Sequence, residues 1–114
     1  MSKPEQEFFE TDTVPVTPCA GSVTGLTERI LAADPAGGVA SRILYFEPGT
    51  DTTPNGVQVH DFWEEVFIME GSFTDLRLGT TFTAGMYASR PPGMEHGPWV
   101  SESGCKTFEV RYRA

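Results

Sequence analysis

Hydrophobic and polar residues alternate in short runs along much of this chain, which is the pattern of β-strands with one buried face. The clearest alternation covers residues 107–112, where every second position is apolar. The apolar set there is Phe108, Val110 and Tyr112, and the polar set is Thr107, Glu109 and Arg111. Further strands are predicted at Val57–His60, Val66–Met69, Phe73–Leu78, around Thr81–Phe82, and at Met86–Arg90.

The segment Leu26–Ala33 is ambiguous, because LTERILAA fits either a short helix or a strand. Its surroundings favour a strand, since a turn sequence at residues 34–38 leads into the β-like run Val39–Phe46. A β-hairpin is therefore predicted, followed by a loop at Glu47–Gly56. Many short strands separated by turn residues favour an all-β sandwich or barrel.

The first twenty residues differ from the rest of the chain. They are polar and acidic, and Pro4, Pro15 and Pro18 prevent a helix of useful length. We therefore expect an extended N-terminal arm over residues 1–20, which would lie on a partner subunit, and one β-barrel domain over residues 21–114. A chain of 114 residues is too short for a second independent core.

The charge and composition of the chain exclude several classes of partner and site. With 8 Lys plus Arg against 16 Asp plus Glu, the net charge is −8, which repels a phosphate backbone, so no nucleic acid is expected as a partner. No apolar run is long enough to span a membrane and no leader pattern is present, so we expect no membrane partner and a cytoplasmic protein. Cys19 and Cys105 are too few for a disulfide scaffold or a thiolate zinc site and are expected to be idle thiols.

Candidate chemistry is concentrated around the two histidines, His60 and His96, because the chain has few other groups for general-base or metal chemistry at neutral pH. Gln58 lies two residues before His60 and would share its face of a strand. Glu64 follows His60 after a short turn, and the RPPG sequence at residues 90–93 can direct His96 back into a barrel.

These residues resemble the two sequence motifs of the cupin superfamily of small β-barrels. Counted back from Gly71, Glu64 occupies the glutamate position of the first motif, His60 its second histidine position and Gln58 its first. The second motif is matched by Gly85, Pro91, Gly93 and His96, with Val100 in place of its asparagine. The segments MEGSFTD, RPPGMEHGPW and SGC are similar to the branch of cupins that contains the anti-sigma factor ChrR and acetylacetone-cleaving dioxygenases.

The resemblance implies a single-domain cupin-type antiparallel β-barrel, that is, a jelly-roll-like double-stranded β-helix. It also implies one divalent metal ion, with Gln58, His60, Glu64 and His96 as candidate ligands. Imidazoles and a carboxylate suit Fe2+, which is favoured, as well as Mn2+, Ni2+, Co2+ or Zn2+. For Gln58 three interpretations stay open: a ligand, a hydrogen-bond donor to a metal-bound water, or the relic of a degraded site.

Two residues are candidates for catalysis. Glu64 is expected to act as a ligand first and as a proton acceptor second. The strand parity that buries Ala88 turns Arg90 inward, where it would orient a carboxylate or enolate; the alternative is an outward guanidinium paired with an acid. Aromatic and methionine side chains near the motifs form either an apolar rim or part of the core: Phe62, Trp63, Tyr87, Met94 and Trp99.

The leading functional hypothesis is a metal-dependent enzyme that acts on a small-molecule substrate with an enolisable carbonyl, by dioxygenase-type cleavage. A metal-dependent isomerase, cyclase or lyase is the alternative, which Gln58 favours because fewer imidazoles donate less electron density to the ion. A non-catalytic metal-binding or sensory module, or a structural barrel without a site, are the other hypotheses. The arm and the expected exposed sheet edges predict a homodimer.

Overall fold

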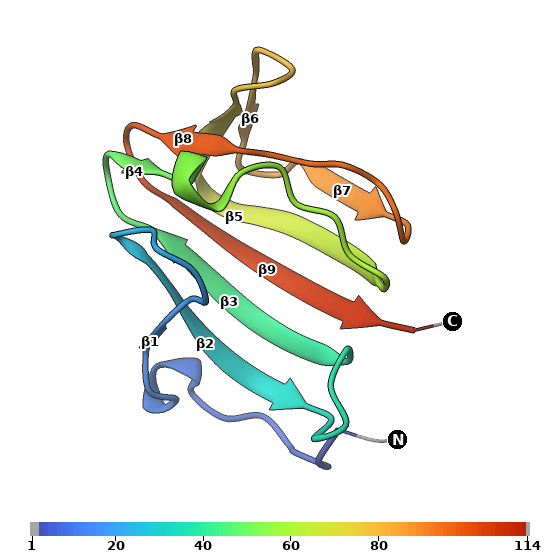
Figure 1. Cartoon of the computed structure of the whole chain (residues 1–114). Coiled ribbons are helices and arrows are strands. Elements are labelled where there is room, and N and C mark those ends of the chain that lie inside the picture. The colour runs from blue at the N-terminus through green and yellow to red at the C-terminus, as the bar shows by residue number, and fades with distance from the viewer. Residues whose placement is uncertain (1–2, 114) are drawn as a thin grey trace.

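The computed structural model describes residues 3–113, and its strands curl into a half-barrel (Figure 1). The strands are β1 (Thr17–Pro18), β2 (Leu26–Ala33), β3 (Ala40–Phe46), β4 (Thr50–Asp51), β5 (Trp63–Asp75), β6 (Thr80–Thr83), β7 (Tyr87–Arg90), β8 (Trp99–Ser101) and β9 (Cys105–Tyr112), with 3-10 turns η1 (Thr11–Thr13) and η2 (Thr53–Asn55). The predicted all-β fold is confirmed. In this part of the chain no helix has the length and apolar character needed to cross a membrane.

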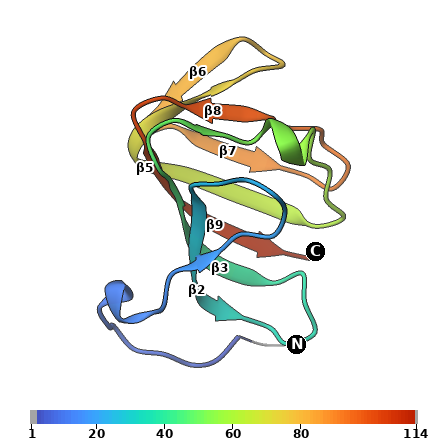
Figure 2. The same ribbon diagram turned by 60° about the vertical axis from the view of Figure 1, so that its left-hand side comes forward.

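All the strand pairs are antiparallel, and the strand order is β1-β2-β3-β9-β5-β8-β4, with β6 and β7 also paired to β5. The strands β2, β3, β9 and the first half of β5 form one wall, and β6 and β8 lie across one end of it (Figure 2). The short strand β4 pairs with β8. The predicted hairpin is confirmed, because β2 and β3 pair from Leu26↔Phe46 to Ala33↔Ala40.

The curl of the sheet originates in β5. Its first half pairs with β7 and β9, whereas its second half pairs with β6 and β8. Between the halves lie a register shift at Ile68/Glu70 and Gly71, which has a φ of +77°. A Cβ at Gly71 would overlap the carbonyl oxygen of Gly104. The prediction of separate strands at Val66–Met69 and Phe73–Leu78 is therefore wrong, because Gly71 bends one strand instead of ending it.

The strand predicted at Val57–His60 is also wrong. This segment makes a single β-bridge, in which Gln58 N donates to His96 O (2.7 Å) and His96 N donates to Gln58 O (3.0 Å). The next antiparallel position on one side would pair residue 56 with Pro98, which has no N–H to donate. The ladder therefore does not continue on that side of the bridge. The short strands β4 and β8 were not predicted.

The alternation in β9 is confirmed, and the polar face is the one that points inward. Thr107 and Glu109 are buried, whereas Phe108 is 37% exposed. In the register of the sheet, Phe108 lies opposite Phe67, which lies opposite Tyr87, and all three are exposed. We call Phe67, Tyr87 and Phe108 the outer apolar face.

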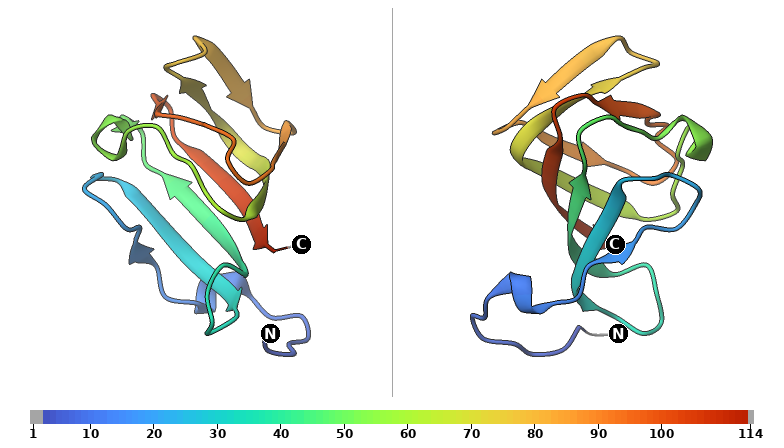
Figure 3. Two further views of the ribbon diagram at one scale, coloured as in Figure 1. Left: turned by 45° about the vertical axis from the view of Figure 1, so that its right-hand side comes forward. Right: turned by 90° about the vertical axis from the view of Figure 1, so that its left-hand side faces the viewer.

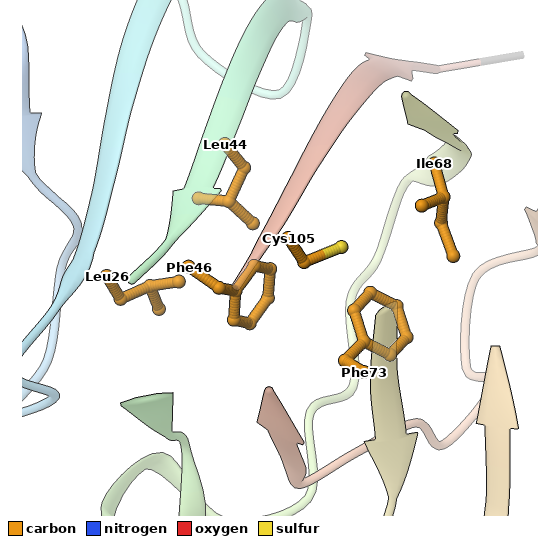
Figure 4. Close-up of a cluster of buried hydrophobic side chains, with 6 residues drawn as sticks. All are labelled: Leu26, Leu44, Phe46, Ile68, Phe73 and Cys105. Atoms are coloured by element: carbon orange, nitrogen blue, oxygen red, sulfur yellow. The ribbon is translucent and has the colours of Figure 1, made fainter. Parts of the chain in front are cut away.

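The hydrophobic core occupies one end of the half-barrel (Figure 4). Its buried members are Leu26, Leu44, Phe46, Ile68, Phe73 and Cys105. The rings of Phe46 and Phe73 lie 5.4 Å apart between centroids, and burial of each such side chain contributes about 1.5–3 kcal/mol. Because this cluster fills only one end, polar side chains line the rest of the interior.

Both cysteines are free, as predicted. Cys105 belongs to the core and Cys19 packs against it. Burial raises the pKa of the Cys19 thiol to about 12 and that of Cys105 to about 11. At neutral pH both are protonated and unreactive.

The segment predicted as an N-terminal arm runs beside the edge of the sheet (Figure 3). Within it, β1 pairs with β2 through Thr17↔Glu28 and Pro18↔Thr27. Near its start, Lys3 Nζ donates to Ser41 Oγ over 2.9 Å. The predicted division at residues 20/21 stays a prediction, and its outer ends, residues 1–2 and 114, lie outside the described residues.

Candidate metal centre

Three predicted ligands, His60, Glu64 and His96, converge inside the half-barrel. One donor atom of each lies within 4.8 Å of the other two. His96 Nε2 is 3.2 Å from His60 Nε2 and 3.8 Å from Glu64 Oε1. Two imidazoles and a carboxylate at these separations are a group that could hold a metal ion.

The backbone places these side chains from both motifs. The bridge between Gln58 and His96 joins the motifs directly, and Gly93 N donates to His60 O over 2.8 Å. Glu64 is fixed by β5, where it pairs with Arg90 of β7 on one side and with β9 on the other.

The orientation of each imidazole is also fixed. His96 Nδ1 lies 3.1 Å from Met94 O, and because a carbonyl only accepts, Nδ1 carries the proton and donates it. His96 Nε2 therefore directs its lone pair toward His60 and Glu64. The His60 ring stacks on Phe62, with centroids 4.6 Å apart and planes 10° from parallel. A second hydrogen bond on the far ring nitrogen is the usual arrangement of a metal-binding histidine.

Both histidines are neutral at neutral pH, which is the form that binds metal. Burial, with a further contribution from Arg90, lowers the pKa of His96 from 6.5 to about 4. Burial also lowers the pKa of His60, outweighing the opposite effect of the Glu64 carboxylate.

Glu64 is only 3% exposed and is surrounded by guanidinium groups. Arg90 Nη1 donates to its Oε1 over 3.2 Å, and Arg111 Nε donates to its Oε2 over 3.3 Å. Arg42 Nη2 lies 3.9 Å from Oε2. These three cations compensate the buried charge of a carboxylate that would otherwise be costly to remove from water.

Arg42 itself is held by two further carboxylates. Its Nη1 donates to Glu28 Oε1 (2.8 Å), and its Nη2 donates to Glu109 Oε1 (2.7 Å). The second oxygen of Glu109 accepts a hydrogen bond from the Thr107 hydroxyl (2.9 Å). The inward polar face of β9 thus belongs to one network with Glu64.

A cavity of about 350 Å³ is lined by the three donor residues and by the charged residues around them: His60, Glu64, His96, Glu28, Arg42, Glu109 and Arg111. Gln58 and Arg90 also line it, and the Arg90 guanidinium is paired there with the acid Glu64, so its side chain lies inside while its expected role in catalysis stays a prediction. The side-chain nitrogen of Gln58 donates to Asn55 O (2.8 Å), and within residues 3–113 no hydrogen bond engages its side-chain oxygen. The predicted role of Gln58 stays a prediction.

Sequence reasoning missed Arg42 and Arg111 as cavity residues. The alternation in 107–112 placed Arg111 on the same face as Glu109, which was the available signal. Among the predicted rim residues, Trp99 lines the cavity and Phe62 stacks on His60. The other three lie elsewhere: Trp63 stacks on Tyr112, Tyr87 belongs to the outer apolar face, and Met94 lines a second cavity of about 130 Å³.

A family model described as the ChrR cupin-like domain matches residues 4–112. The chain belongs to this cupin family. The match spans nearly the whole sequence, so the predicted resemblance is confirmed and the half-barrel is a cupin fold. The meeting of the two sequence motifs in one cavity is therefore a cupin arrangement.

Solved structures agree on the fold. An RmlC-like cupin from Shewanella frigidimarina is 22% identical, with 100% of this chain and 96% of that chain covered and a TM-score of 0.74. An acetylacetone dioxygenase from Acinetobacter johnsonii is 18% identical (95% and 73% covered, TM-score 0.72). The polyketide cyclase RemF from Streptomyces resistomycificus is 19% identical (94% and 79% covered, TM-score 0.75). No curated protein sequence matches the chain significantly.

Proposed function

We propose that this protein is a metal-dependent enzyme that acts on a small molecule with an enolisable carbonyl, by dioxygenase-type cleavage. The observation that carries the proposal is the meeting of His60, Glu64 and His96 in one cavity. Similarity to an acetylacetone dioxygenase supports this chemistry.

The donor set fits a divalent ion, with Fe2+ favoured and Mn2+, Ni2+, Co2+ or Zn2+ also suited to two imidazoles and a carboxylate. When bound, such an ion supplies Lewis acidity at a carbonyl oxygen and, if it is iron, activation of dioxygen. His60, Glu64 and His96 would hold it. Gln58 is the candidate fourth ligand, through its side-chain oxygen, which accepts no hydrogen bond from residues 3–113.

The remaining chemistry belongs to the side chains around the donor group. Glu64 would accept a proton at a carboxylate oxygen, and Arg90 donates to Oε1 of that carboxylate from one side. Arg90 also stacks over Trp99, with its guanidinium carbon 5.3 Å from the ring centroid, which limits its motion. The apolar core at the far end of the cavity keeps bulk water from that side.

A non-oxidative isomerase, cyclase or lyase is the second candidate. It is supported by Gln58 at a position where the first cupin motif has histidine, and by similarity to a polyketide cyclase. An amide oxygen donates less electron density to the ion than an imidazole nitrogen, which disfavours oxygen activation. The same cavity and donor group would serve either reaction.

The test is metal analysis followed by oxygen uptake. The protein is loaded with Fe2+ without oxygen, its metal content is measured, and oxygen consumption is recorded with a panel of enolisable diones and oxo acids. One iron per chain and substrate-dependent uptake support the proposal. Iron binding without uptake for any compound removes the dioxygenase chemistry and leaves the second candidate.

Two variants define the donor group. His60→Ala is expected to abolish stoichiometric iron binding, and Gln58→Ala measures whether position 58 touches the ion. If Gln58→Ala binds iron as tightly as the native protein, the site has three protein ligands. Unchanged iron binding by His60→Ala would remove the proposed site altogether.

A further inference from the structure

The cavity holds six ionised side chains whose formal charges cancel: Arg42, Arg90, Arg111, Glu28, Glu64 and Glu109. Such a balance is expected for a buried network, because an uncompensated charge in this environment is costly. The three arginines differ in how many of their N–H donors are hydrogen-bonded to the protein. We call an arginine closed when its donor atoms are bonded to protein carboxylates, and open when most of its donors are not.

Arg42 is closed. Its Nε, Nη1 and Nη2 atoms all donate to Glu28 or Glu109, over 2.7 to 3.2 Å. Its side chain is only 13% exposed. Arg42 therefore fixes the walls formed by β2, β3 and β9 and has little capacity left for a ligand.

Arg90 and Arg111 are open. Within residues 3–113, each makes one side-chain hydrogen bond, and both bonds go to the same carboxylate, Glu64. A guanidinium carries five N–H donors in a planar fork, so most donors of both groups lack a protein acceptor. Their side chains are 12% and 28% exposed, and both line the cavity.

Aromatic rings hold both open guanidiniums in place. Arg90 lies over Trp99 with its guanidinium carbon 5.3 Å from the ring centroid, and Arg111 lies over Phe62 at 5.1 Å. Since Phe62 also stacks on His60, the Arg111 guanidinium is fixed beside the candidate metal group. Fork-shaped donors that are positioned in advance suit the planar oxygens of a carboxylate.

The proposed metal adds the reason for an anionic ligand. A divalent ion would add two positive charges to a cavity in which the charges of the protein side chains already cancel. The ion would also bind Glu64, the carboxylate that Arg90 and Arg111 share. We infer that the cavity binds a small carboxylic acid, whose carboxylate is held by Arg90 and Arg111 beside the metal. The inference rests on the proposed function, because the excess positive charge comes from the ion. It narrows the substrate to an oxo acid small enough for a cavity of about 350 Å³.

The test compares two probes of similar size, malonate and its neutral counterpart malonamide, by titration calorimetry on protein loaded with Zn2+. The zinc content is measured first. We expect saturable binding of malonate and at least tenfold weaker binding of malonamide, because charge-assisted hydrogen bonds are about twice as strong as neutral ones. Inorganic phosphate, an anion of different shape, is expected to bind more weakly than malonate.

Three variants connect the anion to the two arginines. Arg90→Gln and Arg111→Gln should each weaken malonate binding about tenfold or more, with zinc stoichiometry retained. Arg111→Lys, which keeps the charge and loses the fork, should lie between. Arg113→Gln is the matched control, because Arg113 pairs with Asp61 on the surface and does not line the cavity. It should bind malonate as the native protein does.

The outcomes separate this inference from the proposed function. A protein that takes up neither Zn2+ nor, without oxygen, Fe2+ overturns both, and a protein that takes up Fe2+ alone is titrated in that form. One zinc per chain with equal affinity for malonate and malonamide, or for malonate and phosphate, overturns the carboxylic acid alone. Malonate binding that is unchanged in Arg90→Gln and Arg111→Gln overturns the role of the arginines. The native-protein comparison of probes decides the case even if a variant fails to fold.

Discussion

Acidification should destabilise the metal-free protein through His96. Its pKa is about 4 in the folded chain, against 6.5 when exposed to water. Above 6.5 the imidazole is neutral in both states, and its contribution to stability is fully present. As the pH falls below 6.5, His96 binds a proton in the unfolded chain but stays neutral in the folded chain. Stability is therefore lost until the folded imidazole is also protonated near pH 4.

The size of the effect follows from the two values. A difference of about 2.5 pKa units corresponds to roughly 3 kcal/mol over the whole range. Between pH 7 and pH 5, we expect a loss of about 2 kcal/mol. That is a large fraction of the stability of a domain of this size, which is typically about 5–15 kcal/mol.

Urea unfolding in the presence of a chelator measures this loss. The native protein is compared with His96→Gln at pH 7, 6 and 5, because the amide has a similar polar shape and does not titrate. The difference between the two proteins therefore reports the His96 imidazole together with its contact with His60. We expect the variant to lose about 2 kcal/mol less than the native protein across this range. Equal losses in the two proteins would show that the His96 imidazole titrates normally and that its burial has no such effect.

Three other measurements give distinct expectations. Glu64→Gln leaves the buried guanidiniums without their shared carboxylate and should lower the free energy of unfolding in urea by about 3 kcal/mol. The control Glu70→Gln, in an exposed ion pair, should lower it by less than about 1 kcal/mol. Similar losses in the two variants would contradict the network around Glu64. Gly71→Ala should lower the melting temperature strongly, since its φ is +77° and its Cβ would overlap Gly104; a native-like melting temperature would show that the bend in β5 tolerates a side chain. The predicted homodimer, in which a second subunit would cover exposed sheet edges, should appear in sedimentation velocity at micromolar concentration, and a monomeric native protein would refute it.

Much of the fold was predictable because alternation and turn residues are local signals. The β2–β3 hairpin, β6, β7 and β9 follow from such signals. The failures have non-local causes. Gly71 ends an apolar run in the sequence, but in three dimensions it passes close to Gly104 and lets β5 continue. The segment at 57–60 has a strand pattern but meets a partner that contains Pro98.

The candidate site was predictable where motif spacing carried the information. The resemblance to the two cupin motifs, matched at fixed spacings from Gly71 and Gly85, implied that His60, Glu64 and His96 meet. The motifs do not include Arg42 and Arg111, which lie on β3 and β9, so they could not identify these two cavity residues. Periodicity tells which side chains share a face, but not which face is inside, and here the polar face of β9 lines the cavity.

The isolated β-bridge between Gln58 and His96 affects the rate at which these two backbone amides exchange their protons with solvent. Strands do not flank it, so it can open while the β3–β9–β5 ladder remains intact, and such local openings require less free energy than global unfolding. An ion bound by His60 and His96 would hold this bridge closed through the side chains. The amide protons of Gln58 and His96 should then exchange with deuterated solvent much more slowly in loaded protein, while those of β9 change little. The exchange rates of these two amide protons would therefore report the fraction of the protein that has bound the ion, without any substrate.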